Sequence, residues 1–106
     1  MSEPWGTFCE VFGITSRNRV LEFFLESEDA DYSIDDVAEQ TCLDELATAR
    51  TIFILVKEEL LVLSRISNHT QLYQLNMDHE LVKQLKKEFE TLLNELVKGH
   101  SIKLSS

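Results

Sequence analysis

The sequence has little of what would interrupt a folded chain. Its 106 residues include one proline, at position 4, and three glycines, at positions 6, 13 and 99. No internal stretch is rich in Pro, Gly or Ser, so no linker is indicated. We therefore expect a single domain spanning residues 1–106.

Long hydrophobic runs and a leader pattern are also missing. No apolar run approaches the ~20 residues that a membrane-spanning helix needs. The first residues, Met-Ser-Glu-Pro-Trp, do not place a basic stretch before an apolar one, so a secretory signal is not expected. These features predict a cytoplasmic protein.

Side chains suited to metal binding or catalysis are few and scattered. Cys9 and Cys42 do not form a C-x-x-C pair, and we expect both to be buried and reduced. His69, His79 and His100 lack a ligand spacing such as H-x-x-x-H, so no metal and no other cofactor is expected. The sequence also has no glycine-rich phosphate loop and no nucleophile elbow, which argues against an enzyme.

Positive charge is scarce, and its distribution is uneven. The formal net charge is −9. Residues 1–62 contain four Lys or Arg against fourteen Asp or Glu, a net of −10, whereas residues 63–106 have a net of +1. Strong acidity raises solubility and opposes non-specific binding to nucleic acid. It also suits a salty cytoplasm, where screening weakens such repulsion, and both explanations remain open.

The first thirty residues show the spacing of two helices. Aromatic residues three and four apart predict an N-terminal helix over residues 5–13, ended by glycine: Trp5, Phe8 and Phe12. A second helix should begin at Thr15 or Ser16 and run to about residue 27, burying Val20, Leu21, Phe24 and Leu25. Arg17 and Arg19 lie in its first turn, where the helix dipole disfavours cations. This placement indicates either an anionic partner or two solvated arginines.

A short helix and a longer one follow a polar connection. Ser33 and Asp36 have the spacing of a capping box, and residues 41–44 end the short helix. Asp44 can cap the next helix, over about residues 44–59. Five consecutive apolar residues, 52–56, also fit a strand, but the flanking helix formers favour a helix. A helix apolar over so much of its circumference should bury more than one face.

The last third of the chain predicts a hairpin and a long helix. Residues 61–66 and 71–75 have strand character, with a turn at 67–70. Asn76 should cap a helix over residues 76–98, which Gly99 would stop. Alternating three- and four-residue spacing indicates a coiled-coil seam: Val82, Leu85, Phe89, Leu92 and Leu96. These residues could pack on the protein's own core, but a length of roughly 30 Å favours a seam between two subunits, with the aromatic N-terminal helix beside it.

Two segments carry a family resemblance. Residues 11–22 are VFGITSRNRVLE, and residues 70–76 are TQLYQLN. They resemble the opening and the end of the wing in small archaeal winged helix-turn-helix transcription regulators related to the MarR and ArsR groups. The resemblance covers roughly residues 8–97. It implies a mainly α, α+β fold, with a winged helix-turn-helix core over residues 15–75 and a dimerisation helix over 76–98.

The resemblance also implies a DNA-binding site. In that family the third helix of the core enters the major groove and the wing contacts the backbone or the minor groove. Here these elements would be residues 44–59 and 65–70. Arg50 lies where such a helix presents a base-reading arginine. Phosphate and wing contacts would come from Arg17, Arg19, Arg65, Asn68, His69 and Thr70. The implied function is a homodimeric regulator that binds double-stranded DNA.

The sequence departs from the family pattern in three places, and the last two support an alternative function. Cys42 occupies a turn position that is usually Gly, where a positive φ would cost about 1 kcal/mol. Asp44 and Glu45 stand at the front of the recognition helix, where carboxylates repel phosphate. Phe53 and Ile54 replace exposed charges and form a possible partner patch, unless the N-terminal helix or a second subunit buries them. The alternative is a protein-interaction module with weak or lost DNA binding, pairing with a paralogue or a subunit of the transcription machinery.

Overall fold

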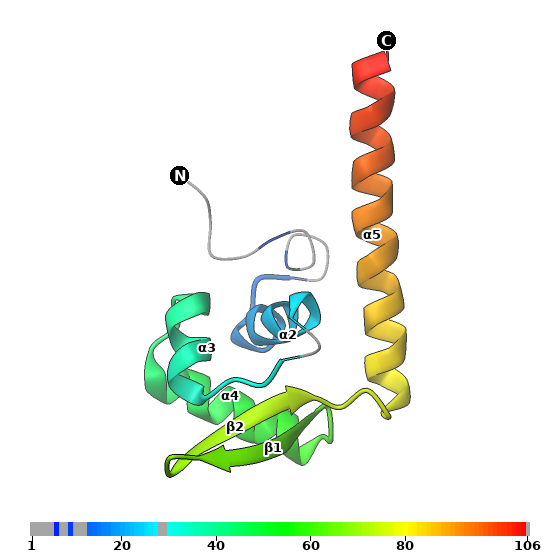
Figure 1. Ribbon diagram of the computed structural model, residues 1–106. Coiled ribbons are helices and arrows are strands. Elements are labelled where there is room, and N and C mark those ends of the chain that lie inside the picture. Colours follow the sequence, from blue (N-terminus) through cyan, green and yellow to red (C-terminus); the bar gives the residue numbers. More distant parts are fainter. Residues whose placement is uncertain (1–5, 7–8, 10–12, 28–29, 106) are drawn as a thin grey trace.

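The order of elements agrees with the predicted one. The computed structural model describes residues 6, 9, 13–27 and 30–105, with side-chain surroundings up to residue 95. Its elements are α2 (Ser16–Glu26), α3 (Ile34–Thr41), α4 (Glu45–Lys57), β1 (Leu61–Ser67), β2 (Thr70–Leu75) and α5 (Glu80–Ser105). Helices α2, α3 and α4 pack together, the antiparallel hairpin lies at one end of them, and α5 stands at the side (Figure 1). Most of the predicted N-terminal helix, with Trp5, Phe8 and Phe12, lies outside the described residues.

Side-chain caps fix the starts of three helices. Thr15 Oγ accepts a hydrogen bond from the backbone N–H three residues on, at 3.1 Å, and the Asp44 carboxylate does the same at 2.9 Å. Both bonds of the predicted capping box between Ser33 and Asp36 are present. Each such cap stabilises its helix by about 1 kcal/mol, and the predicted starts of α2, α3 and α4 are confirmed.

The core is formed by one face of each helix and by the base of the hairpin. The predicted inward residues of α2 are all buried, and they meet Val37, Ile52, Leu55, Leu61, Tyr73, Leu75 and Val82. Tyr32 and Tyr73 form an isolated antiparallel bridge: the N–H of each donates a hydrogen bond to the carbonyl of the other, at 2.9 and 2.8 Å. Tyr32 therefore lies beside β2. The hairpin is thereby attached to the segment between α2 and α3.

A buried carboxylate in α2 was missed by the sequence reasoning. Glu22 is only 4% exposed. Its two oxygens accept hydrogen bonds from the backbone N–H groups of Gly6, at 2.6 Å, and Cys9, at 3.1 Å. Burying a carboxyl group requires such partners, and here Gly6 and Cys9 supply them. Glu22 therefore ties these two residues to α2.

Helix α4 buries one face only, and the expectation that it buries more is wrong. Its inward residues are Thr48, Thr51, Ile52 and Leu55. Thr48 and Thr51 can occupy the core because their hydroxyls donate to backbone carbonyls one turn earlier, at 2.9 and 2.8 Å. Their inward position turns other apolar side chains outward: Leu46, Phe53 and Ile54 are exposed.

The turn between α3 and α4 has the geometry that usually requires glycine. Cys42 has φ 58° and ψ 30°, the left-handed region. Since its side chain is exposed at this cap, the prediction that it is buried is wrong, whereas Cys9 is buried as predicted. Helix α4 ends in a similar way, because Glu59 has φ 66° and the N–H groups of Glu59 and Leu60 donate back to carbonyls of its last turn at 2.9 Å.

The hairpin closes through a two-residue turn. Asn68 and His69 have φ of 50° and 66°, as a type I′ turn requires at both central positions. Strand pairing runs from Leu61 opposite Leu75 to Ser67 opposite Thr70, and an irregularity between Leu63 and Arg65 shifts the register. The predicted strands are thus confirmed, each extended by one residue toward the turn.

Helix α5 starts later and ends later than predicted. Asn76 does not cap it directly, because the Asn76 side chain accepts from the N–H of Asp78 and donates to the Glu59 carbonyl, at 3.1 and 2.8 Å. The helix begins at Glu80 and continues through Gly99 to Ser105. A glycine inside a helix costs only about 1 kcal/mol, so Gly99 does not force a stop. No helix in the described part of the chain is long and apolar enough to cross a membrane.

Candidate nucleic-acid interface

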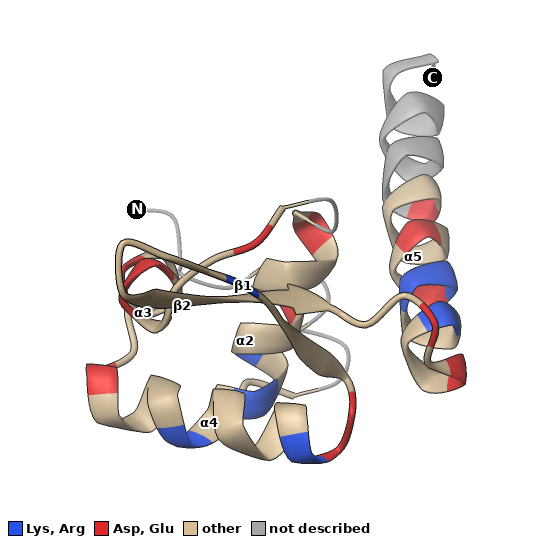
Figure 2. Ribbon diagram, turned by 60° about the horizontal axis from the view of Figure 1, so that its bottom comes forward, with Lys and Arg blue, Asp and Glu red and all other residues tan. Residues whose placement is uncertain are grey.

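The outward stripe of α4 combines two cations with two large apolar side chains. Leu46, Arg50, Phe53 and Lys57 follow a spacing of three and four residues, and all four are exposed. Figure 2 shows Lys and Arg along the outer edge of α4 and acidic residues at both of its ends. Arg50, the predicted base-reading residue, therefore points away from the core.

The hairpin presents a fixed arginine and a polar tip. The Arg65 Nε donates to Asp31 Oδ2 at 2.9 Å, and the Ser64 hydroxyl donates to the same oxygen at 2.8 Å. These two bonds, Ser64 first, lower the pKa of the Asp31 carboxyl. Arg65 itself remains 65% exposed. The other predicted wing residues are exposed at the tip: Asn68, His69 and Thr70.

The two arginines of α2 have different surroundings. Arg17 forms an ion pair with Glu58 at 2.9 Å, in which both side chains are about two-fifths exposed, so it lies beside the C-terminal end of α4. Arg19 donates from Nη2 to the carbonyl of Thr41, the last residue of α3. The Arg19 contact favours a structural role in the turn between α3 and α4 over the predicted phosphate contact.

Carboxyl groups crowd the front of α4. Asp44 and Glu45 are exposed there, as predicted. Asp35, at the start of α3, joins them: a hydrogen bond with Asp35, and then repulsion from its charge, raise the pKa of Glu45. Asp35 was not singled out from the sequence, because the two residues meet only through the packing of α3 on α4. This end of the helix would repel phosphate.

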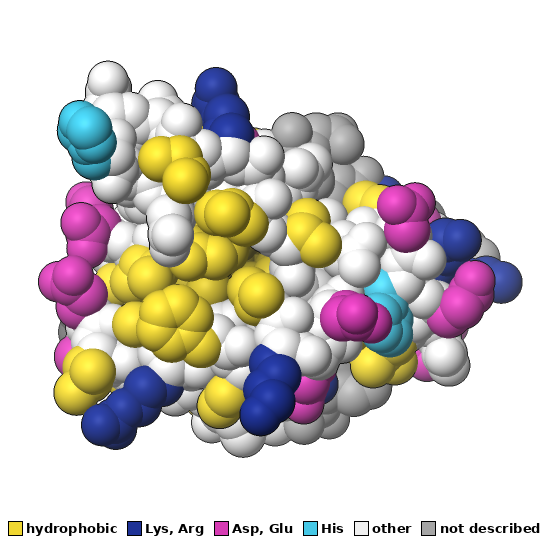
Figure 3. All heavy atoms as spheres, turned by 90° about the horizontal axis from the view of Figure 1, so that it is seen from below, with side chains coloured by type: hydrophobic (Ala, Val, Ile, Leu, Met, Phe, Trp, Pro, Cys, Tyr) yellow, Lys and Arg dark blue, Asp and Glu magenta, His cyan; other side chains and the backbone are white. Residues whose placement is uncertain are grey.

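Apolar side chains occupy the rest of the same side. Exposed fractions are 60% for Leu46, 58% for Phe53 and 62% for Ile66. Ile54, Val62 and Leu63 are also exposed. Figure 3 looks onto this side and shows hydrophobic side chains gathered between α4 and the hairpin, with charged groups around them. We call the five residues Leu46, Phe53, Ile54, Leu63 and Ile66 the apolar face; Val62 precedes Leu63 in β1 and points to the other face of the hairpin. Of these residues, only Phe53 and Ile54 were predicted from the sequence to form a partner patch.

Several solved structures share this arrangement. A possible transcriptional regulator from Methanosarcina mazei Go1 has a TM-score of 0.56 at 17% identity, covering 86% of this chain and 82% of its own. The adhesin competence repressor AdcR from Streptococcus pyogenes has a TM-score of 0.62 at 17% identity, covering 92% and 70%. ZitR from Lactococcus lactis, a mutant, has a TM-score of 0.60 at 19% identity, covering 84% of this chain and 59% of its own.

The chain has the winged helix-turn-helix fold. The sequence matches no family model and no curated protein sequence, and at such identities the structural likeness establishes the fold alone. Within this fold, α4 is the second helix of the helix-turn-helix pair α3–α4, and the β1–β2 hairpin is the wing.

The predicted dimer seam lies largely in the protein's own core. Val82 is fully buried and Phe89 nearly so, and Leu85 packs against the same core cluster. This burial favours the alternative, own-core packing, for these three residues. Leu92 is half-buried, whereas Leu81 and Leu93 are each 41% exposed. The surroundings of Leu96 lie outside the described side chains. An intermolecular surface on α5 would therefore use a different side of the helix.

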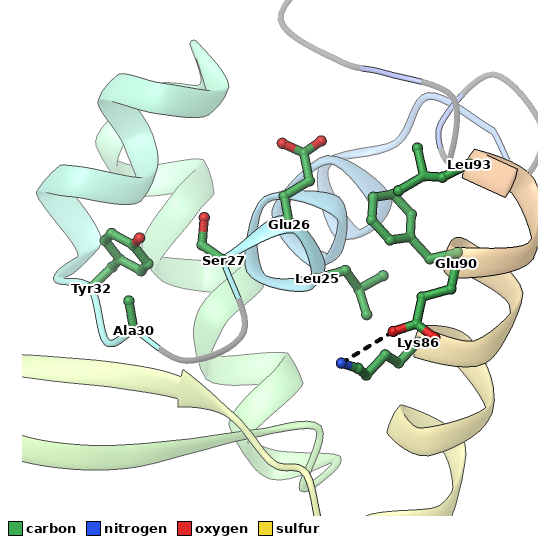
Figure 4. Close-up of a pocket in the computed structure, with 9 residues that line it drawn as sticks. Leu25, Glu26, Ser27, Ala30, Tyr32, Lys86, Glu90 and Leu93 are labelled. Carbon is green, nitrogen blue, oxygen red and sulfur yellow. Dashed lines mark ion pairs between the residues drawn. The ribbon is translucent and has the colours of Figure 1, made fainter. Parts of the chain in front are cut away.

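A cleft separates the C-terminal end of α2 from α5. Its volume is about 630 Å³, and its lining includes Leu25, Phe89 and Leu93 (Figure 4). Lys86 and Glu90 form an ion pair of 3.3 Å at its edge. Burial, and then the nearby charge of Glu22, raise the pKa of Glu26 on the opposite wall. Among the described residues, no cluster of three or more His, Cys, Asp or Glu is arranged to hold a metal ion.

Proposed function

We propose that this protein is a homodimeric winged-helix transcription regulator that binds double-stranded DNA through α4 and the wing. The observation that carries the proposal is the exposure of Arg50, Lys57 and Arg65 on the recognition helix and the wing of one winged helix. The similar solved structures include a possible transcriptional regulator and a repressor, which supports the same function class. Such a protein would act in the cytoplasm.

Each exposed cation has a distinct proposed role. Arg50, in the middle of α4, can bond both acceptors of a guanine edge in the major groove. Lys57 on the same stripe of α4, Arg17 beside the C-terminal end of α4 and Arg65 on the wing would contact phosphates, with the wing tip following the backbone. Each phosphate contact should change the slope of log affinity against log salt by about −0.9. Because few cations are available for phosphate contacts in this chain of net charge −9, the affinity for DNA should depend only weakly on salt concentration.

The test is a selection of binding sites from randomised duplexes, with wild type, Arg50→Ala and Lys83→Ala in parallel. Lys83 is a matched control, because it is an exposed cation on α5 whose ion-pair partner is Glu80. We expect wild type and Lys83→Ala to enrich sites whose two halves lie about one helical turn apart, ~34 Å, and Arg50→Ala to lose them. Absence of any enriched site, or enrichment that survives Arg50→Ala, would contradict the proposed role.

The homodimer is proposed from the part of α5 that extends beyond α2 and from the exposed leucines on either side of its buried residues. Helix α5 extends well beyond α2 (Figure 1), Leu81 and Leu93 are exposed on it, and Leu93 borders the cleft beside α2. A second α5 packed there would cover these side chains. Light scattering should give about twice the chain mass of 12.3 kDa. Leu93→Glu is the appropriate disrupting variant, since Phe89 belongs to the monomer's core, and a monomeric wild type would refute the dimer.

A second candidate function rests on the apolar face. Exposed contiguous apolar patches commonly mark protein contacts, and this patch lies where DNA would bind. A protein-interaction module predicts that the duplex selection fails while a protein ligand still depends on Phe53.

A further inference from the structure

The apolar face has more exposed hydrophobic side chains than DNA recognition would explain. Single exposed hydrophobic residues are ordinary, but five on one side of two neighbouring elements are not. In the major groove the main apolar partner is the thymine methyl group, which would cover little of Phe53, Leu46 or Ile66. Most of this surface would remain without an apolar partner in a complex with DNA.

The apolar face adjoins a carboxyl group through a defined hollow. A hollow of about 480 Å³ lies between the wing and the start of α3, with Ile34, Asp35, Ile66 and His69 in its lining. Aliphatic and acidic groups therefore share one concave surface. A lysine or arginine fits both, because its aliphatic stem can lie on Ile66 while its charged end reaches a carboxylate.

The N-terminal end of α4 is complementary to such a cation. We call Asp44, Glu45 and the neighbouring Asp35 the acidic front of α4. Glu45 interacts with Asp35, and their mutual repulsion disfavours the doubly charged pair. A cation from a partner would relieve that repulsion, whereas phosphate would increase it. A second copy of this chain is a poorer occupant, because each copy carries a net charge of −9 and would bring another acidic front to the same place.

We propose that the apolar face and the acidic front of α4 dock a protein segment in which large apolar side chains stand next to Lys or Arg. Bound there, the segment would cover Arg50 and exclude DNA. The inference rests on the proposed function only for this competition with DNA; the docking itself is independent of it.

The test is a selection of random peptides displayed on phage against the full chain, with counter-selection on Phe53→Ser. We expect enriched peptides that combine apolar residues with Lys or Arg. Synthetic versions should bind Ile66→Thr and Glu45→Gln at least about fivefold more weakly than wild type. Met77→Ser and Glu80→Gln are matched controls, because they remove an exposed apolar side chain and an exposed carboxylate near the start of α5, and they should bind as wild type does.

Other outcomes would overturn the inference. Peptides that bind Phe53→Ser equally well would place the docking site elsewhere. Enriched peptides without cations, or with acidic residues, would refute the charge complementarity. A loss of self-association in Phe53→Ser would identify a second copy as the occupant. If a peptide binds as expected but no duplex is ever enriched, the docking stands and the proposed DNA function fails.

Discussion

Replacing Cys42 by glycine should stabilise the protein. Cys42 ends α3 with φ 58° and ψ 30°, and its side chain is exposed. A β-carbon in the left-handed region costs about 1–2 kcal/mol. Glycine removes this clash but loses about 0.5–1 kcal/mol through its greater freedom in the unfolded chain. The expected net gain is therefore about 0–1.5 kcal/mol, because no buried contact is lost.

The measurement is reversible unfolding by urea and by heat at one protein concentration, since association would also change stability. A gain of 1 kcal/mol should raise Tm by about 4 °C for a domain near this size. Cys42→Ala is the deciding control, because it removes the thiol and keeps the β-carbon, and should change stability by less than about 0.5 kcal/mol. Equal gains from both variants would show that the thiol, and not backbone strain, was responsible.

The remaining predictions concern two arginines of α2 and the carboxyl groups of Glu22 and Glu45. Arg19→Ala should lower the free energy of unfolding by about 1–2 kcal/mol, because the charged side chain of Arg19 donates a hydrogen bond to the end of α3. Arg17→Ala should change the free energy of unfolding by less than about 1 kcal/mol, because its ion pair is exposed. Similar losses in the two variants would contradict the structural role of Arg19. Glu22→Leu should lower the free energy of unfolding by about 1–3 kcal/mol, because it removes the acceptor of two backbone N–H groups. Glu22→Gln should lower it less, and hydrogen exchange of those two amides should be slower in Glu22→Gln than in Glu22→Leu. The raised pKa of Glu45 means that its charged form is disfavoured in the folded state, so Glu45→Gln should raise Tm at pH 7. That advantage should vanish as the pH falls through the raised pKa, when wild type is protonated beside Asp35, and a pH-independent difference would exclude this origin.

Local signals in the sequence predicted the fold well. Ser33 with Asp36, and Asp44, identified helix starts because a cap depends on residues only three positions apart. The polar turn at 67–70 located the wing for a similar reason. Gly99 misled the prediction of the end of α5, because glycine permits a helix to end without requiring it.

The candidate site was predicted less completely, because it depends on contacts between elements. The apolar spacing of α4 did not show which face turns inward, since Thr48 and Thr51 enter the core by bonding their own backbone. The sequence does not distinguish Arg19 from Arg17, because only the packing of α3 brings the Thr41 carbonyl within reach of Arg19. Glu22 gave no signal, since a glutamate on an amphipathic helix is ordinarily solvated.

The attachment of α5 to α4 sets how the two DNA-facing elements of a dimer would be spaced. The Asn76 side chain and backbone donate to the consecutive carbonyls of Glu59 and Leu60, at 2.8 and 2.9 Å, so the start of α5 is tied to the segment that follows α4. In a dimer formed through α5, the angle between the two long helices would then determine the distance between the two copies of α4. A molecule that changed this angle would alter which half-site spacing the pair can match, without touching a single base-reading residue.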